Sequence, residues 1–246
     1  MTKTGPTLTT NMEKQPTVSC ILTCYNLEDY LGEAVESVRS QTVQPLETIV
    51  IHDGCDKPTM YTGTHTVFRE ENRGVAESRD EGVRIAKGEW LLFLDADDML
   101  AENYIQECLK HTKKADIIYP NVLLWSWWGK EAPKPNQMWY ASSDNITWDE
   151  MLERNGVVVS SLLRRDVYEK VGGFDPRLPV FEDWGFWLKA KDAGYRFQKA
   201  NTILKYRQKT NSRNRQRDEV KSFCLRQIRQ RYAGHLTKRG RKILGF

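Results

Sequence analysis

The chain has 246 residues, of which 39% are hydrophobic and 28% are charged, so it has enough apolar side chains for one sizeable core. No run approaches the roughly 18 apolar positions of a transmembrane helix, which argues against a membrane-spanning protein of that kind. The net charge of +4 is unevenly divided, because residues 1–204 carry a net −8 and residues 205–246 a net +12.

The first sixteen residues are polar and lack the apolar core of a signal peptide. We therefore expect residues 1–16 to be a disordered segment and the protein to be cytoplasmic. The five cysteines are odd in number and show no paired C-x-x-C spacing. This pattern indicates neither a disulfide framework nor a zinc site, and we expect reduced, mostly buried thiols.

Strand and helix patterns alternate along the first hundred residues. β-Branched and apolar runs predict strands, and apolar residues at helical spacing predict the helices between them. In chain order we predict a strand over 17–23, a helix over 27–41, strands over 46–54 and 64–69, a helix over 74–88 and a strand over 90–98. This order predicts an α/β fold with a mostly parallel sheet covered by helices on both faces.

Acidic side chains follow two of these strands. One buried strand leads directly into Asp95, Asp97 and Asp98, and another ends in Asp53. Ligands bind beyond the carboxyl ends of strands in such sheets, because loops converge there on a crevice. A D-x-D pair on a turn suits one Mg²⁺ or Mn²⁺ ion that also bridges a diphosphate. The competing interpretation is that Asp97 or Asp98 caps a helix starting near Ala101.

Four ordered motifs resemble those of the family 2 glycosyltransferases. They are "VSCILTCYNLEDYLGEAVESVRSQT", "IVIHDG", "ENRGVAESRDEGVRIAKGEWLLFLDADDML" and "VGGFDPRLPVFEDWGFWLKAKDAGYRF". The resemblance covers about residues 17–212 and implies a GT-A, Rossmann-like domain that binds a nucleotide-diphosphate sugar, usually UDP-linked. It also favours the interpretation that the acids after residue 94 hold Mn²⁺ or Mg²⁺.

The resemblance implies roles for individual donor-side residues. Thr23 and Tyr25 would line the nucleotide pocket, and Asp53 would accept a hydrogen bond from the base. Arg79 matches a position facing the nucleotide or its phosphates, although an exposed helical arginine is the alternative. Asp95 would contact the ribose or donor sugar, and Asp97 would bind the metal.

The acidic pair in "FEDW" is the candidate acceptor-side site. The family's inverting mechanism needs a base that takes the proton of the attacking acceptor hydroxyl, and Asp183 matches that base. The alternative is that Glu182 and Asp183 only stabilise the first turn of the helix they precede, through its dipole. Both roles are compatible.

The chain departs from the family pattern at three places. The usual "DDGS" reads "HDGC", so that His52 and Cys55 replace an acid and a serine, and the usual asparagine after Arg79 is Asp80. The family's "YRxHxxS" reads "YRQKTNS", which puts Lys209 where a histidine can reach the metal or the phosphates. A protonated lysine pairs with diphosphate but does not bind a metal, so full metal coordination is in question.

The acceptor is the least determined part of the sequence. A tryptophan-rich segment with prolines and glycine predicts a loop whose rings stack on sugars or bases, or pack as a lid; its tryptophans are Trp125, Trp127, Trp128, Trp139 and Trp148. The remainder, residues 213–246, is predicted to be a basic extension with an amphipathic helix whose apolar face holds Val220, Phe223, Cys224, Ile228 and Tyr232. Such a helix can lie on an anionic membrane, pack on the body or bind phosphates.

The predicted function is therefore an inverting sugar transfer to an acceptor hydroxyl of a glycan or lipid-linked saccharide. A lipid-linked acceptor would bring the protein into peripheral contact with the inner face of the membrane. The alternatives are transfer to hydroxymethylated bases of DNA, bound through the basic tail, and a non-catalytic module that binds nucleotide sugar or nucleic acid. Donor hydrolysis with Mn²⁺ distinguishes the last of these from an enzyme.

Overall fold

The computed structural model describes residues 15–125, 137–139, 146–178, 180–207 and 218–244. Within these ranges the strands form one nine-stranded sheet in the order β3-β2-β1-β4-β8-β6-β9-β5, with β7 paired to β6. The strands are β1 (Val18–Cys24), β2 (Glu47–Asp53), β3 (His65–Arg69), β4 (Trp90–Asp95), β5 (Met99–Leu100), β6 (Ile117–Trp125), β7 (Gln137–Trp139), β8 (Leu162–Arg164) and β9 (Phe197–Arg207).

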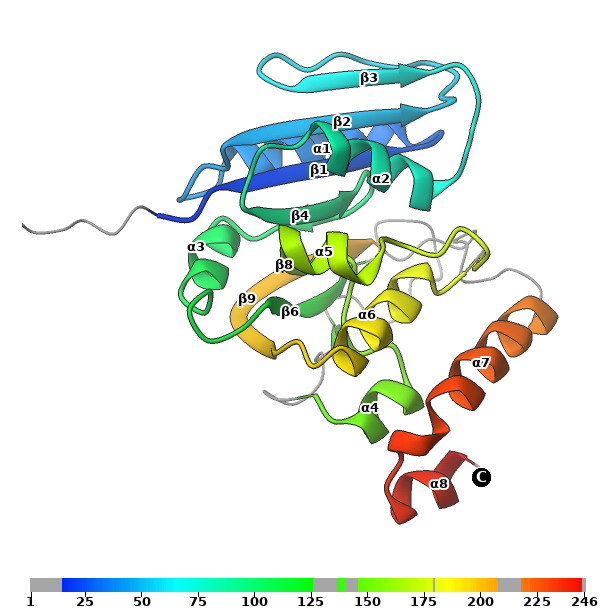
Figure 1. Ribbon diagram of the computed structural model, residues 1–246. Coiled ribbons are helices and arrows are strands. Elements are labelled where there is room, and N and C mark those ends of the chain that lie inside the picture. Colours follow the sequence, from blue (N-terminus) through cyan, green and yellow to red (C-terminus); the bar gives the residue numbers. More distant parts are fainter. Residues whose placement is uncertain (1–14, 126–136, 140–145, 179, 208–217, 245–246) are drawn as a thin grey trace, which may run out of the picture.

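The first half of the sheet is parallel and the second half is mixed. Strands β3, β2, β1 and β4 run in one direction, as the alternating sequence pattern predicts. Strand β8 is antiparallel to both β4 and β6, and the short β5 is antiparallel to β9, while β6 and β9 are parallel. Figure 1 shows the parallel strands stacked at one side of the molecule and β6 and β9 at the other.

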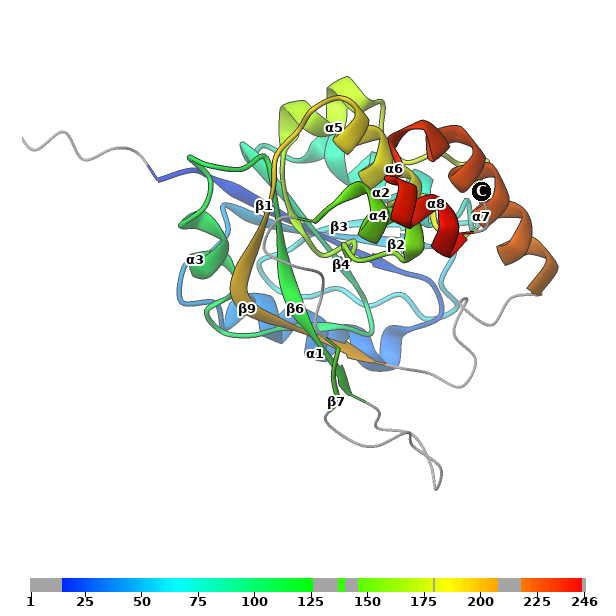
Figure 2. The ribbon, with the colours of Figure 1, turned by 90° about the horizontal axis from the view of Figure 1, so that it is seen from below.

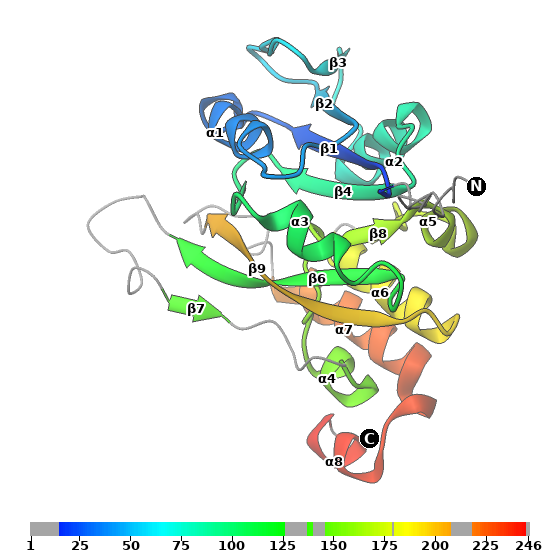
Figure 3. The ribbon, with the colours of Figure 1, turned by 90° about the vertical axis from the view of Figure 1, so that its left-hand side faces the viewer.

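Helices cover both faces of the sheet. They are α1 (Glu28–Arg39), α2 (Val75–Ile85), α3 (Tyr104–Leu109), α4 (Trp148–Glu153), α5 (Arg165–Val171), α6 (Glu182–Asp192), α7 (Asp218–Tyr232) and α8 (Lys238–Leu244), with a 3-10 turn, η2, over Ala233–His235. Figure 3 shows α1 and α2 on opposite sides of β1.

The alternation of side chains along the strands divides the core into two clusters. Leu22 of β1 and Val50 of β2 pack with the buried residues of α1 and α3, in what we call the α1 face. Ile21 and Ile51 pack with residues of α2 and α4 to α7, in what we call the α2 face. Because adjacent strand residues point to opposite faces, the face of each residue at the strand ends follows from this pattern.

Two predicted helix boundaries differ from the structure. The helix predicted over 74–88 ends at Ile85, since Ala86 is already extended and a Cβ on Gly88 would lie 2.5 Å from the Ser19 nitrogen. The helix expected near Ala101 begins at Tyr104, after β5 has paired with β9. The interpretation that Asp97 or Asp98 caps this helix is therefore wrong.

The loop predicted around the tryptophans is partly regular structure. Trp125 is the last residue of β6, and Trp139 belongs to β7, which pairs with β6. Trp148 begins α4, which Thr147 and Glu150 start with a reciprocal capping box. Trp127 and Trp128 lie outside the described residues.

The C-terminal helices pack on the body. In Figures 1 and 2, α7 and α8 lie beside α4 and α6. Ile228 and Tyr232 are buried in the α2-face core, and Cys224 is buried as well. Arg229 donates hydrogen bonds to the carbonyls of Leu152 and Glu153. Of the three alternatives for this helix, the structure shows packing on the body. No helix within the described residues combines the length and apolarity that crossing a membrane requires.

Candidate active site

Three of the predicted donor-side residues lie at one edge of the parallel strands. Thr23 pairs in register with Asp95 on one side and with Ile51 on the other, and Asp53 ends β2 two residues later. Thr23 follows Ile21 by two positions, and Asp53 follows Ile51 in the same way, so both side chains belong to the α2 face. Asp95 follows Phe93 by two and lies on that face as well.

Asp53 is buried and organises the start of α2. Its carboxylate accepts hydrogen bonds from the backbone amides of Arg73 and Gly74, both at 2.9 Å, and from Arg69 Nη1 at 3.0 Å. Gly54 beside it has φ +71°, and a Cβ there would lie 2.4 Å from the Asn72 nitrogen. Only glycine fits this position, because the chain is both left-handed and in contact with the neighbouring loop.

Arg79 joins the edge of β4 to the start of α6. Its guanidinium donates to Asp95 Oδ1 at 2.8 Å and to Glu182 Oε1 at 2.9 Å, and it lies 5.1 Å from the centroid of the Phe174 ring. The arginine side chain is only 3% exposed, and that of Glu182 10%. The alternative of an exposed helical arginine is therefore wrong, because α2 turns this residue towards the sheet.

Asp183 lies in the first turn of α6, beside this bridge. Its carboxylate accepts the Trp184 amide at 2.7 Å and Asn155 Nδ2 at 2.9 Å. Burial, and then the charge of Glu182, raise the pKa of Asp183 to about 6, against the opposing effect of the Asn155 hydrogen bond. Phe181, just before the helix, has φ +65°, a strained conformation for an aromatic residue of the kind found at functional sites.

The turn after β4 is held by an arginine that sequence reasoning missed. The buried Asp98 accepts the Arg207 amide at 3.0 Å, and Arg207 Nε donates to the Asp97 carbonyl at 3.1 Å. The same guanidinium pairs with Glu33 of α1 and lies 4.6 Å from the Tyr30 ring centroid. Arg207 is the arginine of "YRQKTNS", but its partner Asp98 lies 109 residues earlier, so no local pattern reveals the contact.

The acidic side chains act on one shared region. Burial first, and then the negative charges of Asp98, Asp95, Asp97 and Asp183, raise the pKa of the Tyr206 hydroxyl. Asp95 of β4, Asp97 and Asp98 after it, and Asp183 of α6 therefore all lie near enough to this phenol on β9 for their charges to affect it. The Asp97 side chain is partly exposed at the turn, where an ion can reach it. Oxygen ligands of this kind suit Mg²⁺ or Mn²⁺, which is commonly held by one or two carboxylates together with substrate phosphates.

One predicted residue, Tyr25, lies at the margin of this site. Tyr25 follows β1 and is 49% exposed, so its ring is available at the carboxyl edge of the strands. Lys209 lies outside the described residues.

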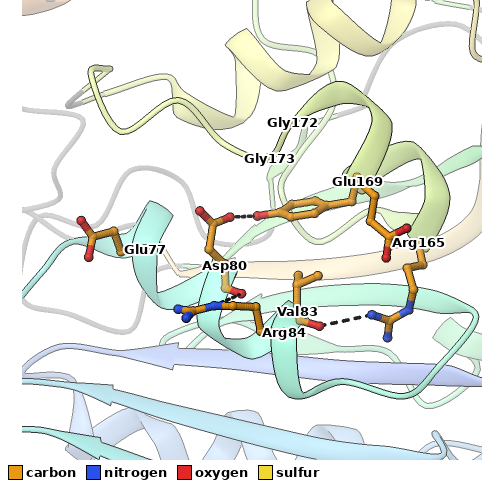
Figure 4. Close-up of a pocket in the computed structure, with 9 residues that line it drawn as sticks. Glu77, Asp80, Val83, Arg84, Arg165, Glu169, Gly172 and Gly173 are labelled. Carbon is orange, nitrogen blue, oxygen red and sulfur yellow. Dashed lines mark hydrogen bonds between the residues drawn. The ribbon is translucent and has the colours of Figure 1, made fainter.

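A separate surface pocket lies between α2 and α5 (Figure 4). The Tyr168 hydroxyl donates to Asp80 there, and Arg165 Nη1 donates to the Val83 carbonyl at 3.2 Å. Asp80, where the family usually has asparagine, is thus engaged by α5. The pocket contains none of the candidate site carboxylates described above, so it is separate from the candidate site at the strand edge.

Known proteins resemble both the sequence and the fold. The chain is 25% identical over 183 residues to the uncharacterized glycosyltransferase YwdF of Bacillus subtilis, covering 70% of this chain and 67% of the relative. It is 27% identical over 143 residues to the glycosyltransferase GlyG of Streptococcus pneumoniae, covering 54% of this chain but 46% of that protein. The structure superposes on S. aureus TarS 1–349 in complex with UDP-GlcNAc with a TM-score of 0.61 and 18% identity, covering 80% of this chain and 60% of that one.

The TarS likeness shows that this mixed α/β fold, with its curled sheet and flanking helices, is of the GT-A type. The sequence profile described as Glycosyl transferase family 2 matches residues 19–172, which contain the β1, β2 and β4 edges and the Arg79 bridge to Asp95. A match over more than half of the chain shows descent as well as fold, and the chain belongs to glycosyl transferase family 2.

Proposed function

We propose that this protein is an inverting glycosyltransferase that moves a sugar from a UDP-linked donor to an acceptor hydroxyl. The observation that carries the proposal is the buried Arg79, which ties the donor-side Asp95 to Glu182 and so holds Asp183 beside the same site. Family membership supports the reaction class, and the UDP-GlcNAc complex of the TarS fragment supports a UDP-linked donor.

Asp183 is the proposed base. The acceptor oxygen attacks the anomeric carbon on the face opposite the diphosphate, the bond from that carbon to the diphosphate oxygen breaks, and the hydroxyl proton passes to the Asp183 carboxylate. The raised pKa of about 6 makes this carboxylate a stronger proton acceptor than an ordinary aspartate, while it remains largely ionised at neutral pH.

The donor residues follow from the strand edge. Thr23 and Tyr25 would line the nucleotide pocket, Asp53 would accept from the base, and Asp95 would contact the ribose or the sugar. Asp53 retains this capacity at Oδ2, which accepts only the Gly74 amide, whereas Oδ1 already accepts from both the Arg73 amide and Arg69 Nη1 and each carboxylate oxygen has two lone pairs. Lys209 would pair with the diphosphate.

Asp97 would hold Mn²⁺ or Mg²⁺, and Arg207 and Asp98 fix the turn that presents it. When bound, such an ion neutralises the charge that develops on the departing diphosphate. The protein's own part is to keep Asp97 partly exposed at the turn, while Arg79 binds the neighbouring Asp95.

The test of the base is Asp183→Asn. We expect donor affinity close to that of the wild type and a transfer rate lower by at least about 10²-fold, since the variant cannot accept a proton. Donor binding is measured by calorimetry and transfer by release of UDP. Equal losses of binding and transfer would assign Asp183 to the donor site or to the structure instead.

The test of the metal residue is Asp97→Asn. We expect loss of metal-dependent donor binding with an unchanged thermal midpoint, because one charged ligand disappears from a solvent-facing turn. Metal and donor affinities equal to those of the wild type would reject the assignment. If the wild-type protein neither binds nor hydrolyses any nucleotide sugar with Mn²⁺, the transfer proposal fails and the non-catalytic alternative, as a nucleic-acid module, is favoured.

The acceptor proposed here is a hydroxyl of a glycan or lipid-linked saccharide, with the protein cytoplasmic and in peripheral contact with the membrane. Hydroxymethylated DNA is the second candidate, and the exposed basic side chains of the C-terminal helices favour a polyanionic partner for either. They include Arg226, Arg231, Lys238, Arg239, Arg241 and Lys242. A screen with lipid-linked sugars, glycans and hydroxymethylated DNA as acceptors distinguishes the two.

A further inference from the structure

Three side chains with sulfur and nitrogen ligand atoms meet on the α1 face of the sheet. Cys24 ends β1 and pairs in register with His52 of β2, and Cys55 follows two residues after β2 ends. The two thiol sulfurs and one ring nitrogen all lie within 4.8 Å of one another. The sequence spacing showed no paired-cysteine motif, because the cluster is assembled by strand pairing and not by neighbours along the chain.

His52 is oriented as metal-binding histidines are. Its Nε2 lies 2.9 Å from the Thr59 carbonyl, which can only accept, so Nε2 carries the hydrogen and Nδ1 has a free lone pair. Nδ1 lies 3.4 Å from the Cys55 sulfur. Two ligands of a tetrahedral zinc ion with ordinary bond lengths are separated by about 3.5 Å. A carbonyl partner on the second ring nitrogen is the usual outer-shell contact of a histidine ligand.

The histidine ring has little freedom to turn away. It is fully buried, and it stacks on Phe68 of β3 with ring centroids 5.2 Å apart and an angle of 17°. The position of Nδ1 is therefore set by packing as well as by the Thr59 hydrogen bond.

The two thiols differ in their access to solvent. The Cys55 thiol donates to the Cys24 carbonyl at 3.2 Å, a hydrogen bond that is lost when this sulfur binds a metal as a thiolate. Cys24 is buried, and Cys55 is partly exposed, so an ion can enter beside Cys55.

We propose that Cys24, His52 and Cys55 bind one Zn²⁺ ion, with its fourth position open on the exposed side of Cys55. Two sulfurs and an imidazole suit this softer ion, whereas the oxygen ligands around Asp97 suit Mg²⁺ or Mn²⁺. The zinc site goes beyond the proposed transfer reaction. It would tie the loop after β1, which carries Tyr25, to the loop after β2, and so stiffen one wall of the proposed nucleotide pocket.

The experiment is a zinc titration of the full-length protein, reduced and freed of metal by a chelator, against a chromophoric competitor for Zn²⁺. Excess Mg²⁺ is present throughout to occupy the carboxylates. We expect one Zn²⁺ per chain, and with Co²⁺ in its place we expect a thiolate-to-cobalt charge-transfer absorption, which carboxylates do not produce.

Two variants and one control locate the site. Cys55→Ser, which restores the family's usual residue, and His52→Asn should each weaken Zn²⁺ binding by at least about 100-fold, since loss of an outer-shell partner alone costs 10- to 100-fold. Cys224→Ser, in α7, should bind as the wild type does. Zn²⁺ should raise the thermal midpoint of the wild type and the control but not of Cys55→Ser.

Several outcomes would overturn the proposal. They are a wild-type protein that binds no zinc under these conditions, binding that is unchanged in both variants, and the absence of the cobalt absorption. A Cys24–Cys55 disulfide found by mass spectrometry in the purified protein, with no zinc binding after its reduction, would also overturn it and make the pair a redox-sensitive link.

Discussion

At the scale of single residues, Asp183 sets the expected pH dependence of transfer. Its pKa is raised to about 6, and the proposed base must be ionised, so kcat/KM should fall about tenfold per pH unit below that value. Asn155→Ala removes a hydrogen bond that favours the ionised form, and the acidic limb should move to higher pH. The check is a pH–rate profile of both proteins with donor affinity measured in parallel. An unshifted limb in the variant would mean that another group controls it.

The raised pKa of Asp183 also makes the free energy of unfolding depend on pH. This dependence has the opposite sign to that of an aspartate whose pKa is lowered by an ion pair. The folded-state value lies above the roughly 3.9 of an unfolded aspartate, so stability is lost as the pH rises from about 4 to about 6. Asp183→Asn should therefore melt at a higher temperature than the wild type at pH 8 and at about the same temperature at pH 4. Calorimetric scans at both pH values test this, and a destabilised variant at pH 8 would contradict it.

Arg79 is the residue whose loss should cost most. Arg79→Met leaves Glu182 buried and Asp95 half-buried without their partner, which we expect to destabilise the fold by about 3–5 kcal/mol. Arg84→Met on the same helix is the matched control, since Arg84 is exposed and its loss should stay within about 0.5 kcal/mol. Urea unfolding measures both. Equal effects would show that the bridge is not a structural element.

At the scale of elements, α7 is a packed helix and not a free tail. Ile228 is 5% exposed in the α2-face core, whereas Phe223 on the same helix is 59% exposed. Ile228→Ala should cost about 2–5 kcal/mol and Phe223→Ala at most about 0.5 kcal/mol, by urea unfolding. A cost that is larger for Phe223 would mean that the helix packs through its other face.

Because α7 packs on the body, a truncation is not a suitable test of its charge. Removing residues after 212 would uncover the core partners of Ile228 and Tyr232, so a loss of acceptor binding in that truncation would not isolate the effect of the charge. The next turn is held too, because Thr237 donates its amide to Asp149 at 3.0 Å and Trp148 stacks on His235 with ring centroids 4.0 Å apart. Charge reversal at exposed positions avoids this problem.

At the scale of the whole molecule, the opposite charges of the two parts predict a polyanion-binding surface. We expect the protein to bind anionic vesicles at low salt and to lose this binding as salt rises. Replacing Arg226, Arg231 and Lys238 by Glu should weaken vesicle binding at least about tenfold and leave donor hydrolysis unchanged, because these side chains are exposed on the C-terminal helices.

Duplex DNA, added as a competitor, distinguishes a membrane partner from a nucleic-acid partner. Displacement from vesicles with a log–log salt slope of about −0.9 per contacted phosphate would favour nucleic acid. If neither vesicles nor DNA bind at low salt, the helices serve only to cover the α2 face, and both partner proposals fail.

Much of the fold and part of the site follow from local patterns in the sequence. Apolar residues predominate in β1, β2 and β4 because these strands are buried on both faces, and the acids that end β2 and β4 are conspicuous beside them. Strand periodicity, and the position of a residue at the end of a strand, can be recognised in the sequence without knowing which distant residues are in contact. The sequence by itself therefore determined the α/β class, the family and the edge of the sheet where the candidate donor residues lie.

Only the tertiary structure decided which side chains are engaged with one another. Arg79 meets Glu182 from 103 residues away and Asp98 meets Arg207 from 109, contacts that carry no local periodicity. The burial of α7 likewise depends on surfaces of α4 and α6 that its own amphipathic pattern cannot specify. The Cys24, His52 and Cys55 cluster has the same origin, because register between β1 and β2 places a histidine beside a cysteine 28 residues distant in the chain.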